Sequence, residues 1–236
     1  MASLKYWVWL ASARGVGAFA ARALLARFGS PERVYAAGRG DYERSGPMKK
    51  SELDGLSDKA LEPSEKAMEK CAQMGYRILT IQDAGYPERL KNIYDPPIVL
   101  YVRGALPDVD AEAVVAIVGT RRCTRYGLRE AERMGHDVTG RGMLVTTGLA
   151  LGVDSAAARG ALSAGGRVIG VVGSGLDVVY PRENGELFDA VASSGAIISE
   201  YPPGAAAAPR HFPARNRIIS GISVGVAVIE APMRSG

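Results

Sequence analysis

Arginines gather in two short segments, each next to a predicted junction between a strand and a helix. The segments read Gly119-Thr120-Arg121-Arg122 and Pro209-Arg210-His211-Phe212-Pro213-Ala214-Arg215-Asn216-Arg217. A guanidinium group is a planar fork that matches phosphate oxygens, and free backbone N–H groups at a helix start attract the same anion. The two segments therefore predict a site for a phosphate-bearing polyanion.

The second segment also carries an aromatic ring among its cations. Phe212 is followed by Pro213 and has arginines on both sides. A cationic groove with an interleaved aromatic side chain is typical of proteins that bind single-stranded nucleic acid, because arginines follow the phosphates and the ring stacks on a base. The structural alternative is that Phe212 fills the edge of a sheet while the arginines pair with Glu200 and Glu230. In either case Asn216 can orient the turn.

Small residues end four predicted strands, and all four ends share one edge of the sheet if the strands are parallel. These ends are Gly119-Thr120, Thr147–Gly152, Gly173-Ser174-Gly175 and Pro202–Gly204. Small residues let the backbone approach a ligand closely, although tight turns need glycine with or without a ligand. Because four such turns occur together and arginines flank them, we expect a ligand at this edge.

The first turn argues against a nucleotide cofactor. In a dinucleotide-binding fingerprint the middle glycine leaves room for the pyrophosphate, but Arg121 occupies that position here. The second strand ends in Thr146-Thr147 rather than in an acidic residue, and the chain has no GxxxxGK[ST] run for ATP. We expect no cofactor.

Catalysis has little support in the sequence. His136 and His211 lie far apart, and no Ser-His-Asp or Cys-His group can be assembled from them. We interpret His136 as structural and Asp154 as a helix N-cap. Cys71 and Cys123 are too few for a disulfide framework or a zinc site. We therefore expect no catalytic residues, no metal and no enzyme activity.

Regular alternation of strands and helices begins near Ala111. The predicted strands are Val114–Val118, Met143–Thr146, Val168–Val172, Ala196–Ser199 and Val224–Ile229, and the predicted helices are Arg125–Arg141, Asp154–Ala164, Glu183–Ser193 and Ala214–Ser220. Continuous Val/Ile runs separated by helices predict an α/β fold, a mostly parallel sheet with helices on both faces. Residues 76–81 and 98–104 are predicted to add strands to it.

The N-terminal segment differs in character. Residues 1–62 read as short helices with glycine hairpins at 11–17 and 53–57, which resemble a SAM-like or helix-hairpin-helix module. We interpret these hairpins as structural or docking elements rather than direct DNA contacts, since no lysines cluster on them. The predicted domains are therefore a helical domain, 1–62, and an α/β domain, 63–236.

Composition sets broad limits. The chain has 236 residues, 47% hydrophobic and 23% charged, with a formal net charge of +4 and a pI near 9.1. This is ordinary globular chemistry and only mildly basic. No apolar run reaches the roughly 20 residues that span a bilayer, and no signal-peptide pattern opens the chain. We expect a cytoplasmic protein without a membrane partner.

Five ordered motifs give the chain a family resemblance. They are Ala116–Arg121, Thr147–Asp154, Gly173–Pro181, Ile198–Gly204 and Phe212–Gly221, and the segment Tyr86–Tyr101 precedes them. In this order they resemble the DNA-processing protein A family (DprA/Smf), strongly over residues 76–236. Thr120 stands where many members have serine, and Leu151 where arginine is frequent. We also expect the chain to be truncated, because members continue beyond Gly236 and many carry a winged helix.

The resemblance implies a function and a site. It implies an extended Rossmann domain that binds single-stranded DNA through its phosphates, loads the RecA recombinase during natural transformation, helps displace single-strand-binding protein and forms a homodimer. The candidate DNA-binding residues are Gly119, Thr120, Arg121, Arg122, Gly148, Leu149, Gly173, Ser174, Gly175, Arg210, His211, Phe212, Arg215, Asn216 and Arg217.

Two other functions stay open. One is a nucleotide-phosphate hydrolase of the cytokinin-activating LOG type, which uses a related sheet but whose PGGxGTxxE run is missing here. The other is a pure interaction scaffold that does not retain DNA.

Overall fold

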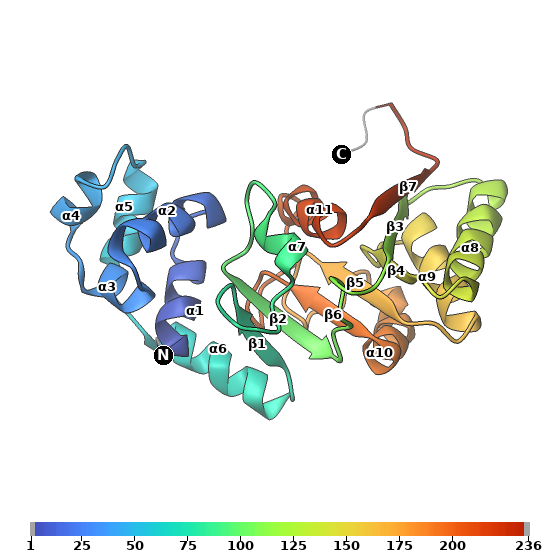
Figure 1. Cartoon of the computed structure of the whole chain (residues 1–236), viewed down its shortest axis with the longest axis horizontal. Coiled ribbons are helices and arrows are strands. Elements are labelled where there is room, and N and C mark those ends of the chain that lie inside the picture. Colours follow the sequence, from blue (N-terminus) through green and yellow to red (C-terminus); the bar gives the residue numbers. More distant parts are fainter. Residues whose placement is uncertain (1–2, 234–236) are drawn as a thin grey trace. The chain divides into compact units, whose positions relative to one another are not determined.

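The computed structural model describes residues 3–233 and divides into two compact units (Figure 1). The first unit is Met1–Tyr86 with Tyr94–Leu100, and the second is Pro87–Ile93 with Tyr101–Gly236. These units include different residues from the predicted domains 1–62 and 63–236, which stay a prediction.

The first unit is mainly helical. Its elements are α1 (Leu4–Ser12), α2 (Ala18–Phe28), α3 (Pro31–Ala36), α4 (Arg39–Glu43), α5 (Lys50–Ser57), α6 (Glu62–Gln73) and strand β1 (Arg77–Thr80). Buried side chains such as Trp9, Leu24, Val34 and Leu56 form its core. The helical N-terminus is therefore confirmed, while its likeness to a SAM-like module stays a prediction.

One glycine hairpin of the first unit was predicted wrongly. Residues 53–57 lie inside α5, not in a turn. Gly55 is needed for packing: a Cβ there would stand 2.0 Å from the carbonyl oxygen of Arg14. The glycine lets α5 touch the loop between α1 and α2, so its absent side chain marks a close helix contact instead of a chain reversal.

The sheet has the order β1-β2-β6-β5-β4-β3-β7. Its other strands are β2 (Val99–Gly104), β3 (Val114–Gly119), β4 (Leu144–Thr147), β5 (Val168–Val172), β6 (Ala196–Ser199) and β7 (Gly225–Ile229). All pairs from β6 to β7 are parallel, whereas β2 runs antiparallel to β6 with Tyr101 opposite Ser199. The β3 to β6 strands are largely buried on both faces, which explains their continuous Val/Ile sequences.

Helices cover the two faces unequally. The elements are α7 (Glu88–Lys91), α8 (Arg125–Gly140), α9 (Val153–Ser163), a 3-10 turn (Arg182–Asn184), α10 (Gly185–Ser194) and α11 (His211–Gly221). Right-handed crossovers from β3 through β6 put α8, α9 and α10 on one face, and the return from β6 to β7 puts α11 on the other (Figure 1). The predicted α/β, Rossmann-like fold with helices on both faces is confirmed.

The start of α11 differs from the prediction. The helix begins at His211, three residues before the predicted Ala214. Pro213 is tolerated because N–H groups of a first helical turn lack intrahelical partners in any case. Phe212 therefore belongs to the first turn of a helix rather than to a loop.

Between residues 3 and 233 there is no helix with the length and apolar character that crossing a membrane requires.

Candidate functional site

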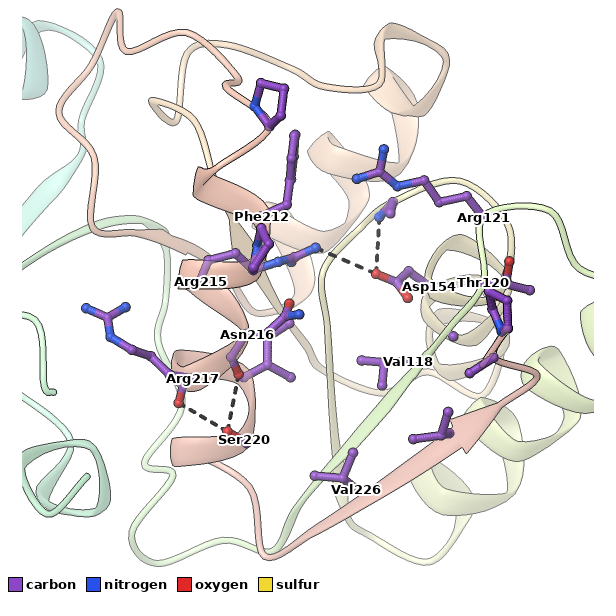
Figure 2. A pocket seen from close by; sticks show the side chains of 18 of the residues that line it. Val118, Thr120, Arg121, Asp154, Phe212, Arg215, Asn216, Arg217, Ser220 and Val226 are labelled. Carbon is purple, nitrogen blue, oxygen red and sulfur yellow. Dashed lines mark hydrogen bonds and ion pairs between the residues drawn. The ribbon is translucent and has the colours of Figure 1, made fainter. Parts of the chain in front are cut away.

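A cleft of about 1080 Å³ lies between α11 and the strands β3 and β7 (Figure 2). Eight of the predicted site residues line it: Gly119, Thr120, Arg121, Arg122, Phe212, Arg215, Asn216 and Arg217. The first four come from the end of β3 and the turn after it, and the others from α11. The fold thus brings together two arginine segments that are about ninety positions apart in the sequence.

Aromatic rings and an arginine form one end of the cleft. The guanidinium carbon of Arg121 lies 4.9 Å from the ring centroid of Phe212, in cation–π geometry. The Phe212 ring in turn lies 5.4 Å from that of Tyr180. Arg121 is exposed and makes no ion pair with any residue between 3 and 233. This end therefore offers a cation with no carboxylate partner beside two aromatic rings.

Tyr180 was not among the predicted site residues. It is 44% exposed and lines the cleft beside Phe212. Its one sequence signal was its place in the Gly173–Pro181 motif. A lone tyrosine in a turn carries no pattern of its own, so only the folded chain shows that it completes the aromatic pair.

Arg215 faces inward rather than into solvent. It is 5% exposed, its Nη1 donates to the carbonyl oxygen of Val171, and its Nη2 lies 3.9 Å from Asp154 Oδ2. Gly148 makes room for it, since a Cβ there would lie 1.9 Å from Nη2. Burial lowers the pKa of Arg215 to about 10. The geometry gives Arg215 and Gly148 a packing role in the wall of the cleft.

Asp154 was predicted to be the N-cap residue of a helix, and this prediction was wrong, because the N-cap of α9 is Gly152. Asp154 is the second residue of α9, and its carboxylate accepts from the backbone N–H of Ala150 at 3.4 Å. Burial raises the pKa of Asp154, an effect that Arg215 and nearby backbone N–H groups oppose. A carboxylate inside the cleft wall holds Arg215 in place and reduces the net positive charge of the site.

Arg217 is ion-paired, as the structural alternative had proposed. Its Nη2 lies 2.7 and 2.8 Å from the two carboxylate oxygens of Glu200. Both side chains are half-buried. Glu230, the other acid in that alternative, has a different partner. The ion pair between Arg217 and Glu200 must therefore break before a phosphate can take the place of the Glu200 carboxylate on the guanidinium group.

Glu230 occupies the start of α8. Its carboxylate accepts from the backbone N–H of Thr124 at 2.8 Å and from the Thr124 hydroxyl, and these bonds lower the pKa of Glu230. Its carbonyl oxygen accepts from Thr120 N–H at 2.9 Å. Free N–H groups at helix starts were predicted to attract phosphate. At the start of α8, however, the carboxylate of Glu230 already accepts from the backbone N–H of Thr124. Positive charge at the turn between β3 and α8 comes instead from the side chains of Arg121 and Arg122.

The third predicted turn lies beneath a loop, outside the cleft. Gly175 N–H donates to the carbonyl oxygen of Ala205 at 2.9 Å, and Ser174 Oγ donates to the carbonyl oxygen of Val178 at 2.8 Å. A Cβ on Gly173 would stand 3.2 Å from His211. These small residues serve close packing, and a DNA contact by them stays a prediction.

Three further predicted residues also lie away from the cleft lining. The Leu149 side chain is fully buried in the core. The His211 ring stacks on Tyr201 at 3.9 Å, with Nδ1 3.0 Å from the carbonyl oxygen of Gly173. Arg210 is exposed at the entry to α11. His136, predicted as structural, is 57% exposed on α8, where its Nδ1 lies 3.5 Å from Asp137.

The other end of the cleft is apolar. Val118, Ile219, Val226 and Val228 line it, and Val226 and Val228 are 53% and 59% exposed (Figure 2). Here β7 is the edge strand of the sheet, and three of its five residues are exposed. The cleft therefore has a cationic, aromatic end and an apolar end.

Comparison with known proteins identifies the family. Residues 77–236 match the model of the DNA recombination-mediator protein A family. The chain belongs to this family. The resemblance found in the sequence is thereby confirmed.

Named relatives agree with this assignment. Protein Smf of Synechocystis sp. is 35% identical over 243 residues, covering 98% of this chain and 59% of the relative. DNA processing protein DprA of Streptococcus pneumoniae is 43% identical over 157 residues, covering 66% of this chain and 55% of the relative. The chain thus spans less than two thirds of the length of these relatives.

Two solved structures share the fold. The X-ray structure of DprA from Streptococcus pneumoniae has a TM-score of 0.83 at 32% identity, covering 100% of this chain and 81% of its own. A DprA structure from Helicobacter pylori, described by its single-stranded DNA binding mode, has a TM-score of 0.62 at 31% identity, covering 68% of this chain and 71% of its own.

Proposed function

We propose that this chain binds single-stranded DNA at the cationic end of the cleft. The observation that carries the proposal is Arg121, which is exposed, has no carboxylate partner between residues 3 and 233, and lies on the Phe212 ring. Phosphates bind the guanidinium groups of Arg121 and Arg122, and a base stacks on Phe212 or Tyr180. The single-stranded DNA binding described for the Helicobacter pylori relative supports this.

The wider role follows from the family. We propose that the full-length protein acts in the cytoplasm as a homodimer, protects incoming strands during natural transformation, helps displace single-strand-binding protein and loads RecA. Support comes from the family description as a recombination mediator and from the relatives named DNA processing protein. The role requires binding and hand-over of a strand, so no chemical step or cofactor enters it.

Binding to a fluorescent oligothymidine tests the proposal. Arg121→Ala and Phe212→Ala are expected to weaken binding, Phe212→Ala by about 5- to 150-fold if one stacked base is lost. Arg44→Ala is the control, because Arg44 is exposed but paired with Asp41 in the helical unit. The proposal fails if the wild type does not retain DNA at low salt, or if Arg121→Ala binds as tightly as the wild type.

The hydrolase alternative is tested separately. The protein is incubated with nucleoside monophosphates, and free base is sought by chromatography. We expect none. Release of free base at a catalytic rate would contradict the non-enzymatic proposal.

A further inference from the structure

A row of arginines continues from the cleft along α8. Arg125 and Arg129 are exposed and make no ion pair with any residue in the range 3–233. They are four residues apart, so they lie on the same helix face, about 6 Å apart along an axis that rises about 1.5 Å per residue.

This face points away from the protein. The buried residues of α8 are Gly127, Ala131 and Gly135, which form the side of the helix that packs on α9 and the sheet. At 3.6 residues per turn, Arg125 and Arg129 fall on the opposite side. Their guanidinium groups therefore stand in solvent and are open to a large ligand.

The stretch that contains this face carries a net positive charge. Residues 121–141 contain six arginines and three carboxylates, which is a net charge of +3 within a whole chain of +4. Of the carboxylates, Glu130 pairs with Arg133 and Asp137 lies beside His136. Glu132 is exposed and lies on the same face, three residues after Arg129, where it offsets one of the two charges. The potential over this face is consequently positive.

The arginine face is continuous with the cleft. Arg121 and Arg122 line the cleft, and only Cys123 and Thr124 separate them from the first residue of α8. A polyanion that leaves the cleft past Arg122 meets Arg125 and then Arg129. Tyr126, 62% exposed, stands next to this path and offers an aromatic face.

We propose that the outer face of α8, with Arg125 and Arg129 as its main contacts, is a second track for the phosphate backbone of the same DNA strand. The inference rests on the proposed function. A nucleic acid fits this face better than a protein partner does, since it carries cations and an aromatic ring without the apolar centre of a typical protein interface. The track adds affinity only for strands long enough to leave the cleft.

Oligonucleotide length separates the track from the cleft. The test uses oligothymidines of about 6 and about 20 nucleotides, the shorter within the range that one compact site covers. The variant Arg125→Ala/Arg129→Ala is expected to bind the short strand as the wild type does and the long strand more weakly. Loss of two phosphate contacts lowers the salt slope by about 1.4, so the deficit shrinks about sevenfold between 50 and 200 mM salt.

Two controls accompany the double variant. Arg125→Lys/Arg129→Lys keeps both charges and is expected to restore most of the salt slope. Arg167→Ala removes an exposed arginine that pairs with Glu112 at the opposite end of the strands, and is expected to leave both affinities unchanged.

Each result decides between the two proposals. The double variant could bind both strands as the wild type does, while Arg121→Ala still lowers the affinity for the short strand. In that case the proposed track is wrong, and the proposed site in the cleft holds. Equal weakening of both strands also overturns the track. Weaker binding of purified RecA with unchanged DNA binding would assign the face to a protein instead. If the wild type binds neither strand, both proposals fail.

Discussion

Four arginines line the cleft, and their surroundings differ. Arg121 lies on an aromatic ring, Arg122 is exposed, Arg215 is buried against Asp154, and Arg217 is held by Glu200. A ligand can bind Arg121 and Arg122 without breaking an ion pair. The buried pair instead fixes the shape of the cleft wall.

Removing the carboxylate of the buried pair should destabilise the protein. In Asp154→Asn the guanidinium of Arg215 stays buried without its counter-ion, which costs about 3–5 kcal/mol in comparable pairs. Urea unfolding measures the change. Asp189→Asn is the control, since Asp189 pairs with Arg103 on the surface; a loss as large as that in the control, or smaller, would show that the buried pair does not hold the wall.

A lysine in the helical unit should make stability depend on pH. Lys59 Nζ lies 4.8, 5.2 and 5.0 Å from the rings of Trp9, Tyr35 and Tyr42, and donates to the carbonyl oxygen of Ala37. Burial lowers the pKa of Lys59 to about 8 from 10.5. Above pH 8 the folded protein then binds fewer protons than the unfolded chain, so the free energy of unfolding rises with pH.

Urea unfolding between pH 8 and 9.5 tests this. We expect the wild type to gain stability over that range and Lys59→Met to gain less. The range stays below pH 10, where the opposite effect of Tyr42 begins, because its pKa is raised to about 12 by burial. Identical pH profiles for the two proteins would contradict the assignment.

Single residues were predictable where local chemistry decides their role. Arg121 and Phe212 were assigned from the residues beside them, and both line the cleft. The burial of Arg215 could not be read in the same way, because it depends on Gly148 and Asp154, about sixty positions earlier. In the sequence these arginines look equivalent, and only tertiary packing determines which of them are buried and which are exposed.

At the scale of elements, α8 and α9 cross through glycines. A Cβ on Gly135 would stand 2.1 Å from the carbonyl oxygen of Ala157, and one on Gly160 would stand 1.9 Å from that of Glu132. These contacts set how closely α8 approaches α9. They therefore also position the arginine face that continues from the cleft.

An alanine at this crossing should destabilise the protein. Gly135→Ala forces backbone apart, and overpacking of this kind typically costs about 1–3 kcal/mol. Thermal or urea unfolding measures the loss. Gly140→Ala is a matched control in the same helix, since no atom lies within 4 Å of its added Cβ; equal stability of the two variants would rule out a tight crossing.

Glu230 should fix the turn between β3 and α8, because it accepts from Thr120 and from Thr124. In Glu230→Ala the backbone N–H of Thr124 loses its acceptor, so its hydrogen exchange is expected to accelerate with that of neighbouring turn amides. Amide exchange followed by NMR measures this. Glu186→Ala, in the first turn of α10, should leave those amides unchanged. Unaltered exchange at Thr124 would mean that Glu230 does not cap α8.

Strand positions were predictable to within one residue, because buried parallel strands require continuous Val/Ile runs bounded by small residues. The strands β5 and β6 match their predicted ranges. Helix starts and glycine roles were less predictable. Because of Pro213, the start of α11 was predicted three residues too late. In the sequence Gly55 indicates a turn, whereas in the structure it allows a close contact between α5 and the loop after α1.

At the scale of the molecule, the cleft lies where the chain changes direction across the sheet. From β3 the crossovers run toward β6 on one face, while α11 returns to β7 on the other. Open α/β sheets bind ligands at such a switch point, beyond the carboxyl ends of the strands. The sequence predicted this edge of the sheet, but the strand order that brings β7 beside β3 emerges only from long-range packing.

Salt dependence of DNA binding tests the central claim most directly. The affinity of the wild type and of Arg121→Ala for one oligothymidine is measured across salt concentrations. For a strand held by its phosphates, log K falls with log salt by about 0.7 per contact, so Arg121→Ala should bind more weakly and show a slope about 0.7 shallower. A flat salt response of the wild type, or equal slopes for the two proteins, would contradict phosphate binding by Arg121.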